Sequence, residues 1–392
     1  MNPPAQRWTA TGSAGPTIGR RSMLIMGVAG SLALTGCTSS GQQPSPSGSA
    51  AGTGTPAPTP TPLPGTVEAG ATENELAQYA AAILAGFGKH LAAQDRHLIT
   101  AIRDAHLAHV AALGSPDPVS VPAPSPTTGA SSPTSGSSPT VTPEATTAGS
   151  GSATNSAGAS GSALPTGTAT GSPTAPTLPK SPAKAIKKLR ALETKASAAH
   201  RKRALDPTGP QDQRGWLTLL WGSLATAADD YARALTAGRD PGAHPDQDHR
   251  VAVKLPDAAT AVQNLVEQCY PIIFGYQAAI AGLSGSAADH ARSSLAAHRA
   301  LRDQLSKWLT EQKADVPNAH AAYDLPVQPT SPSRAAKLLG TMEDQLLPYL
   351  GQWLASSKDD QESGLTAMIT GTRNVGYWTH KINIWPGWPV QR

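Results

Sequence analysis

The stretch AVQNLVEQCYPIIFGYQAAI, residues 261–280, decides the fold class of this 392-residue chain. Its apolar side chains recur every three or four residues, which is the period of one face of an α-helix. Three further stretches with the same period follow, within residues 295–309, 331–353 and 365–378. Amphipathic helices bury their apolar faces against one another, and four of them form a bundle. We therefore predict a four-helix domain over residues 251–392.

The connection between the second and third of these helices is long and runs through Tyr323-Asp324-Leu325-Pro326. One long connection is typical of ferritin-like bundles rather than of simple up-and-down bundles. Pro271 and Pro348 lie inside the first and third predicted helices. Each proline removes one backbone hydrogen bond, so kinks are expected at both positions.

Four motifs in this region resemble an actinobacterial family of ferritin-like lipoproteins. They are Glu267-Gln268-Cys269-Tyr270, Ala297-His298-Arg299-Ala300-Leu301-Arg302-Asp303, Ala322-Tyr323-Asp324-Leu325-Pro326 and Trp385-Pro386-Gly387-Trp388-Pro389. The resemblance covers the last third of the chain well and the preceding helices loosely. It implies a ferritin-like fold with no established activity.

The sequence lacks the ligand pattern of a di-iron bundle, which needs a Glu from each of two helices and a Glu-x-x-His from each of the other two. No Glu-x-x-His occurs anywhere in the chain. We therefore expect no metal ligands, no cofactor and no catalytic residues. Instead, Glu267, His298, Arg302 and Glu343 are predicted to form a polar network that fixes the register of the helices, with Arg302 offsetting the carboxylate charge.

The N-terminus, residues 1–37, has the pattern of a lipoprotein signal peptide. Arginines precede an apolar run from Met23 to Leu34, which is too short to span a bilayer. The ending Leu34-Thr35-Gly36-Cys37 resembles a bacterial lipobox, which implies cleavage before Cys37 and acylation of that cysteine. Arg20-Arg21 also resembles a twin-arginine export signal. The expected location is the extracytoplasmic face of the cell membrane, through a lipid anchor.

Two segments are dominated by Ser, Thr, Pro, Gly and Ala, and such segments bury too little apolar area to offset their ordering entropy. Residues 38–70 are predicted to be a disordered tether, and residues 114–180 a disordered insertion. The helical pattern between them and after them predicts a second bundle over residues 71–240, interrupted by the insertion. The expected fold is thus all-α, with tandem antiparallel helical bundles.

Three smaller features of the sequence are a pair of histidines, an internal cysteine and a basic helix. His106-x-x-His109 places two imidazoles on one helix face, but no carboxylate or cysteine at helical spacing completes a metal site, so both are expected to be partly exposed. Cys269 lies on an apolar stripe and is expected to be an inert buried thiol. The basic helix over residues 184–203 is expected to be a solvated face, with contact to anionic lipid headgroups as the alternative.

These features favour a non-catalytic envelope lipoprotein that binds a protein, lipid or glycan partner. The alternative is a ferritin-like metal-binding protein or oxidase with an atypical ligand set. Nucleic acid is not an expected partner outside the membrane, although the net charge is +4.

Overall fold

The computed structural model describes residues 62–115, 117–119, 176–242 and 249–391. The predicted signal peptide, Cys37 and most of the predicted tether lie outside these residues, as does most of the predicted insertion. The first helix begins at Thr66, inside the range that the composition assigned to the tether.

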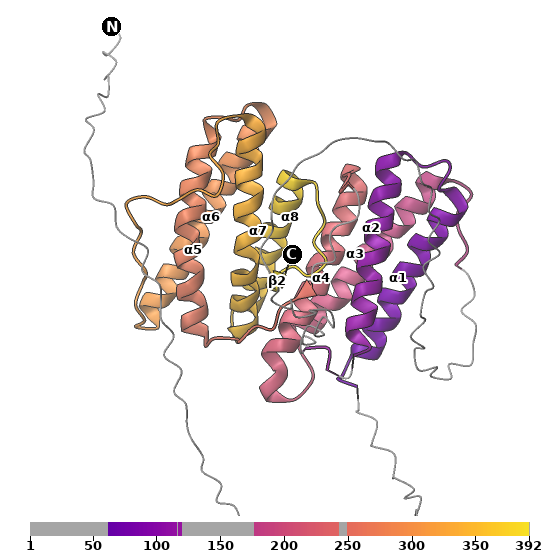
Figure 1. Cartoon of the computed structure of the whole chain (residues 1–392). Coiled ribbons are helices and arrows are strands. Elements are labelled where there is room, and N and C mark those ends of the chain that lie inside the picture. Colours follow the sequence, from indigo (N-terminus) through magenta and orange to yellow (C-terminus); the bar gives the residue numbers. More distant parts are fainter. Residues whose placement is uncertain (1–61, 116, 120–175, 243–248, 392) are drawn as a thin grey trace, which may run out of the picture. The chain divides into compact units, whose positions relative to one another are not determined.

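The fold is all-α, as predicted (Figure 1). The described residues form eight α-helices and a short 3₁₀ turn, and strand β1 pairs antiparallel with strand β2. The elements are α1 Thr66–Phe87, α2 Ala93–Leu113, α3 Pro182–Leu205, η1 Gln211–Gln213, α4 Arg214–Ala237, β1 His249–Arg250, α5 Ala258–Ile280, α6 Gly285–Glu311, α7 Pro332–Ser356, α8 Gln361–Thr379 and β2 Val390–Gln391.

The helices form two bundles with the same connectivity. In the first, α1 packs on α2 and α3, and α3 packs on α4; in the second, α5 packs on α6 and α7, and α7 packs on α8. The second and third helices of each bundle are joined by a long connection, residues 114–181 in one and 312–331 in the other. The prediction of tandem bundles with a long connection is confirmed.

The third helices of the two bundles also begin in the same way. Ser181 and Ser331 are N-caps whose side chains accept from the backbone N–H of Lys184 and Arg334. Pro182 and Pro332 each occupy the first helical turn, where proline costs no hydrogen bond. The Ser-Pro pair is therefore a reliable sequence signal for the helix start in both halves.

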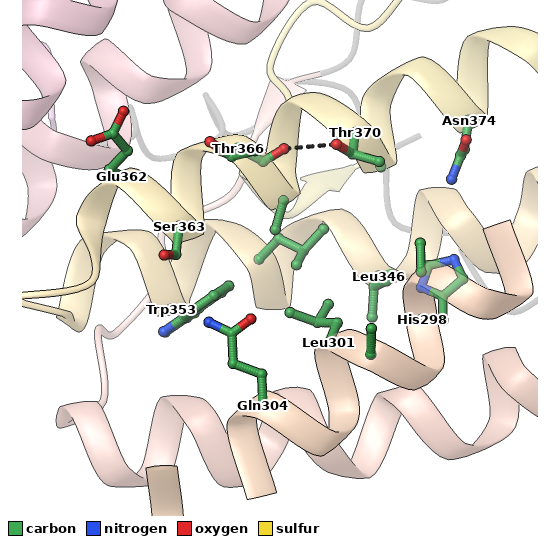
Figure 2. A pocket seen from close by; sticks show the side chains of 15 residues that line it. His298, Leu301, Gln304, Leu346, Trp353, Glu362, Ser363, Thr366, Thr370 and Asn374 are labelled. Atoms are coloured by element: carbon green, nitrogen blue, oxygen red, sulfur yellow. Dashed lines mark hydrogen bonds between the residues drawn. The ribbon is translucent and has the colours of Figure 1, made fainter. Parts of the chain in front are cut away.

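The second bundle contains an elongated groove of about 430 Å³ between α6 and α8, above the side chains of α7. Figure 2 shows Glu362 and Ser363 at one end of the groove and His298 and Asn374 at the other. Leu301, Leu346, Leu350 and Trp353 supply apolar surface between these ends.

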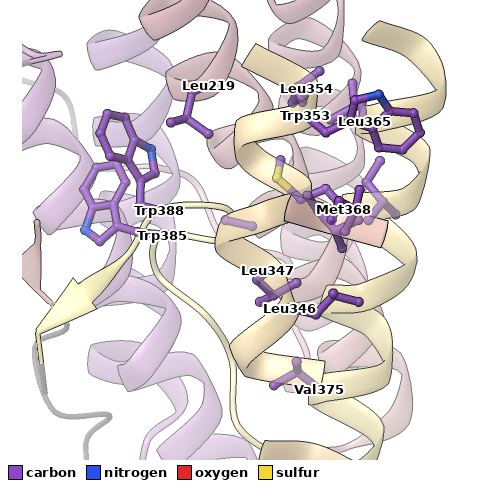
Figure 3. Packing of buried hydrophobic residues seen from close by; sticks show 14 of the residues in the cluster. Leu219, Leu346, Leu347, Trp353, Leu354, Leu365, Met368, Val375, Trp385 and Trp388 are labelled. Carbon is purple, nitrogen blue, oxygen red and sulfur yellow. The ribbon is translucent and has the colours of Figure 1, made fainter. Parts of the chain in front are cut away.

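The C-terminal tail packs onto both bundles through Trp385 and Trp388 (Figure 3). Gly387 has φ +84°, a conformation that side chains with a Cβ rarely adopt. A Cβ on Gly351 in α7 would overlap the carbonyl oxygen of Gly387. The turn of the tail can therefore lie against α7 only because both positions are glycine.

Arg250 of β1 also holds the tail, through contacts with its two tryptophan rings. Its guanidinium Cζ lies 4.4 Å from the ring centre of Trp385 and 4.9 Å from that of Trp388. Its Nη1 donates to the carbonyl oxygen of Pro118 at 2.9 Å. Together with the β1–β2 pair, these contacts hold the residues that follow α8 in one place.

None of the helices in the described ranges is long and apolar enough to cross a membrane.

Candidate metal centre

The first bundle contains a cluster of buried ionisable side chains. Helix α1 supplies Glu73, α2 supplies His106 and His109, and α3 supplies Glu193 and His200. None of the five residues is more than 1% exposed. Groups of this type are rarely buried unless they pair with one another or bind a metal.

Helical spacing places each of these residues in the core. Glu73 follows buried Ala69 by one turn on the apolar face of α1. Likewise, Glu193 follows buried Leu189 on α3, and His200 lies two turns further along the same face. The polar residues thus occupy positions that the apolar pattern assigns to the core.

Glu73 is the centre of the cluster. Its Oε2 lies 2.7 Å from Nδ1 of His106 and 2.7 Å from Nδ1 of His109. Its Oε1 lies 2.8 Å from Nε2 of His200. One carboxylate therefore faces three imidazoles from two other helices.

The outer nitrogens of the two α2 histidines have fixed partners. Nε2 of His106 lies 2.9 Å from Oε1 of Glu193, and Nε2 of His109 lies 2.8 Å from the carbonyl oxygen of Ile384 in the C-terminal tail. A carbonyl cannot donate, so Nε2 of His109 carries the proton. The Nδ1 atom of His109 then faces Glu73 with either a second proton or a metal ion in between.

The pKa values of the metal-free cluster follow from burial and charge. Burial lowers the pKa of His106, but Glu193 and Glu73 on either side outweigh it and raise that pKa to about 10. Burial raises the pKa of Glu73, yet the charges of His106 and His109 and their hydrogen bonds hold it well below its usual value. The pKa of Glu193 is raised, mainly by burial. Without a metal, the cluster is thus held by an imidazolium between carboxylates.

Aromatic rings and an arginine form the walls of the cluster. The Tyr231 ring contacts His106 edge-on, and the Trp385 ring centre lies 4.7 Å from that of His109. Arg203 contacts Nδ1 of His200 at 3.4 Å and lies over the ring of Trp221. These contacts fix the imidazole planes and keep the cluster from solvent.

The residues fit a divalent transition-metal ion. The ligand atoms of Glu73, His106 and His109 all lie within 4.8 Å of one another. Two imidazoles and a carboxylate suit zinc, iron, nickel and similar ions. Ligating histidines almost always donate their second ring N–H to a carboxylate or a backbone carbonyl, as His106 and His109 do here. His200 holds the other oxygen of Glu73.

The structure corrects the sequence interpretation of the α2 histidines. His106 and His109 are each 1% exposed rather than partly exposed. The carboxylate partners that helix α2 itself lacks are Glu73 of α1 and Glu193 of α3, which are far from α2 in the sequence. Sequence reasoning missed Glu73 and Glu193, although a glutamate in register with an apolar stripe on each helix was a usable signal.

The second bundle has a polar centre built from one side chain of each helix. Oε1 of Glu343 accepts from Nε2 of His298 and Nδ2 of Asn374, each at 2.8 Å, and from the hydroxyl of Tyr276. Trp378 Nε1 donates to the Tyr276 oxygen at 3.1 Å. With one carboxylate and one imidazole, this centre offers too few metal ligands for a closed site.

Of the four residues predicted for the network in this bundle, the structure brings together Glu343 and His298 only. Glu267 is exposed on α5. Arg302 forms an ion pair with Asp303 at 2.6 Å and lies over the Tyr270 ring. The predicted role of Arg302 as the buried counter-charge is therefore wrong: neutral donors, Tyr276 and Asn374, surround Glu343 instead.

Cys269 is buried, and burial raises the pKa of its thiol to about 12. The expectation of an unreactive thiol agrees with this environment.

Comparison with known proteins gives a family match within the second bundle. Residues 259–390 match the model of a domain of unknown function, DUF4439. A solved structure of a conserved hypothetical protein from Mycobacterium tuberculosis is similar at 24% identity and a TM-score of 0.30, over 31% of this chain and 95% of that one. Comparison with curated proteins gives no match. The metal centre lies outside the matched residues, except for its contacts with the tail.

Proposed function

We propose that this protein is an envelope lipoprotein whose first helical bundle binds one divalent transition-metal ion through Glu73, His106 and His109. His200 and Glu193 act as positioning residues. This is the metal-binding alternative of the sequence analysis, located in the other bundle from the one that resembles ferritin-like lipoproteins.

The main support for this proposal is the arrangement of His106 and His109. Their Nδ1 atoms both face Oε2 of Glu73, and their Nε2 atoms are both oriented by acceptors. In a bundle without a metal, the desolvation cost of these buried charged groups must be offset by their ion pairs alone. A metal ion on the Nδ1 side replaces the protons and leaves each Nε2–H donor in place.

The burial of the centre points to a resident ion rather than an oxidase. The proposed ligands and the positioning residues Glu193 and His200 are at most 1% exposed, so a substrate larger than a small molecule reaches the ion only if the helices separate. Three protein ligands leave a fourth coordination position, and in a site this buried only a ligand as small as water could occupy it. The ion would tie α1 to α2 directly, and α3 would be held through the contacts of Glu193 with His106 and of His200 with Glu73.

The envelope location rests on the sequence alone. The basic and apolar N-terminal segment ends in the lipobox-like Leu34-Thr35-Gly36-Cys37. Acylation of Cys37 would hold the two bundles at the outer face of the membrane without a spanning helix.

Metal content tests the proposed function. The purified full chain should contain about one equivalent of zinc, iron, manganese or nickel by mass spectrometry, and Glu73→Gln and His109→Gln should each lose most of it. His298→Gln is the matched control, because His298 is also buried and also bonded to a buried glutamate. Metal that persists in both first-bundle variants, or is lost in the control, would contradict the assignment.

A further inference from the structure

The groove of the second bundle is a candidate binding site that is separate from the metal centre. Fifteen residues of α6, α7 and α8 line it. Its floor and walls are mostly apolar, with Leu301, Leu346, Leu350 and Trp353 as the large members. Its volume of about 430 Å³ lies in the range of small-molecule sites.

Small side chains on α6 and α8 keep this space open. Ala297 and Ala300 of α6 and Ala367 and Gly371 of α8 line the groove and carry no side-chain atom beyond Cβ. On α8 the lining runs from Glu362 to Asn374, a little over three helical turns, or about 18 Å at 1.5 Å per residue. The groove thus suits an extended chain better than a compact ring system.

The charges around the groove exclude an anionic ligand. The lining contains no Lys or Arg, and its one carboxylate, Glu362, pairs with Arg201 at 2.8 Å. At the other end, Glu343 lies behind His298 and Asn374, both of which are hydrogen-bonded to it. A carboxylate or phosphate headgroup placed there would lie close to the buried carboxylate of Glu343, and the lining supplies no Lys or Arg to pair with it.

The inner end offers a ring nitrogen for hydrogen bonding instead. Nε2 of His298 is bonded to Glu343, and among the described residues no hydrogen bond to Nδ1 on the other side of the ring is present, so a hydroxyl, which can both donate and accept, suits this position. His298 lines the groove. A hydroxyl of a ligand would complete this site whichever of the two atoms carries the proton.

We propose that the groove between α6 and α8 binds a neutral lipid: an aliphatic chain along Leu301, Leu346 and Trp353, with an uncharged hydroxyl headgroup at His298. This function is independent of the metal centre in the first bundle.

The test uses the full chain and two probes of equal length, 1-decanol and decanoate, in isothermal titration calorimetry. We expect 1-decanol to bind and decanoate to bind at least about tenfold more weakly, because only decanoate buries an unpaired charge. Equal or tighter binding of decanoate would overturn the proposal, and so would failure of both probes to bind.

Variants locate the binding. Ala367→Phe fills the groove from α8, and Thr370→Phe does so from an exposed position that cannot disturb the core. Both should weaken 1-decanol binding by about tenfold or more. Ala296→Phe, exposed on α6 outside the groove, should leave it unchanged.

Binding that survives both groove variants would overturn the site. A dimer in analytical ultracentrifugation that dissociates in Thr370→Phe, with neither probe bound, would show that a second copy covers the groove and would also overturn the lipid assignment.

Discussion

Nε2 of His109 in helix α2 donates a hydrogen bond of 2.8 Å to the carbonyl oxygen of Ile384, 275 residues later in the chain. Ile384 belongs to the tail that follows α8 and lies within the part of the chain that matches DUF4439. The orientation of a proposed metal ligand in the first bundle therefore depends on a backbone carbonyl that the second bundle supplies. Tests of the metal centre need the whole chain.

Displacing the tail should weaken metal binding without touching a ligand. Gly387→Ala introduces a Cβ where φ is +84°, and Gly351→Ala introduces one that overlaps the Gly387 carbonyl. Each should shift the tail and loosen the Ile384 acceptor, which corresponds to a loss of about 10- to 100-fold in metal affinity. Competition with a chromophoric chelator measures the change.

The control for this experiment is Gly242→Ala, which has a positive φ but nothing within 4 Å of the added Cβ. It carries the same kind of backbone strain at a distance from the tail. Metal affinity equal to wild type in both tail variants would show that the carbonyl of Ile384 does not orient His109.

Metal binding should depend on pH through His106. Its pKa of about 10 in the metal-free protein lies above the ordinary value of 6.5, so its proton stabilises the metal-free fold fully below about pH 6.5 and loses this effect as the pH rises towards 10. A metal ion must displace that proton. Affinity should therefore rise with pH over this window, by up to about tenfold per unit for each proton released.

Calorimetric titration in buffers of different ionisation enthalpy counts the released protons. Metal affinity that is flat from pH 6.5 to 9, with no proton release, would mean that the ion binds elsewhere.

The polar centre of the second bundle should matter more for stability than Arg302 does. Tyr276→Phe removes a donor to Glu343 and the acceptor of Trp378 Nε1, so it leaves buried polar groups unpaired at a cost of about 1–3 kcal/mol. Arg302→Met breaks a partly exposed pair with Asp303 and a contact with the Tyr270 ring, and should cost less than about 1 kcal/mol. Urea unfolding midpoints compare the two, and the reverse order would restore Arg302 to the network.

Acylation of Cys37 is a prediction from the sequence. Cys37→Ala should release the protein from the membrane fraction into the soluble fraction, because a spanning helix is not available among the described residues. Cell fractionation and immunoblotting measure the distribution. Unchanged membrane retention of the variant would rule out a lipid anchor at this position.

The helices of both bundles could be predicted because each carries a long apolar stripe with a clear period, and because Ser181-Pro182 and Ser331-Pro332 mark helix starts. The polar centres could be predicted only in part. Glu343 and His298 were predicted correctly from their positions on the inward faces of their helices, but Glu267 lies one position off the buried stripe that contains Val266.

The metal centre could not be assembled from the sequence because its members are separated by long stretches of chain. Local spacing reveals His106 and His109, but Glu73 and His200 meet them only through the packing of three helices. The Ile384 acceptor is a backbone atom, and no side-chain pattern reports it. Periodicity places residues on a helix face, whereas contacts between helices depend on register and crossing angle.

Anomalous X-ray scattering can test directly whether Glu73, His106 and His109 bind a metal ion. The data would be collected from crystals of the full chain, above and below the absorption edge of the metal found in it. We predict one strong peak in the first bundle, about 2.0–2.2 Å from Oε2 of Glu73 and from Nδ1 of His106 and His109. Absence of a peak among these three residues in metal-containing protein, or a peak beside Glu343 and His298 instead, would contradict it.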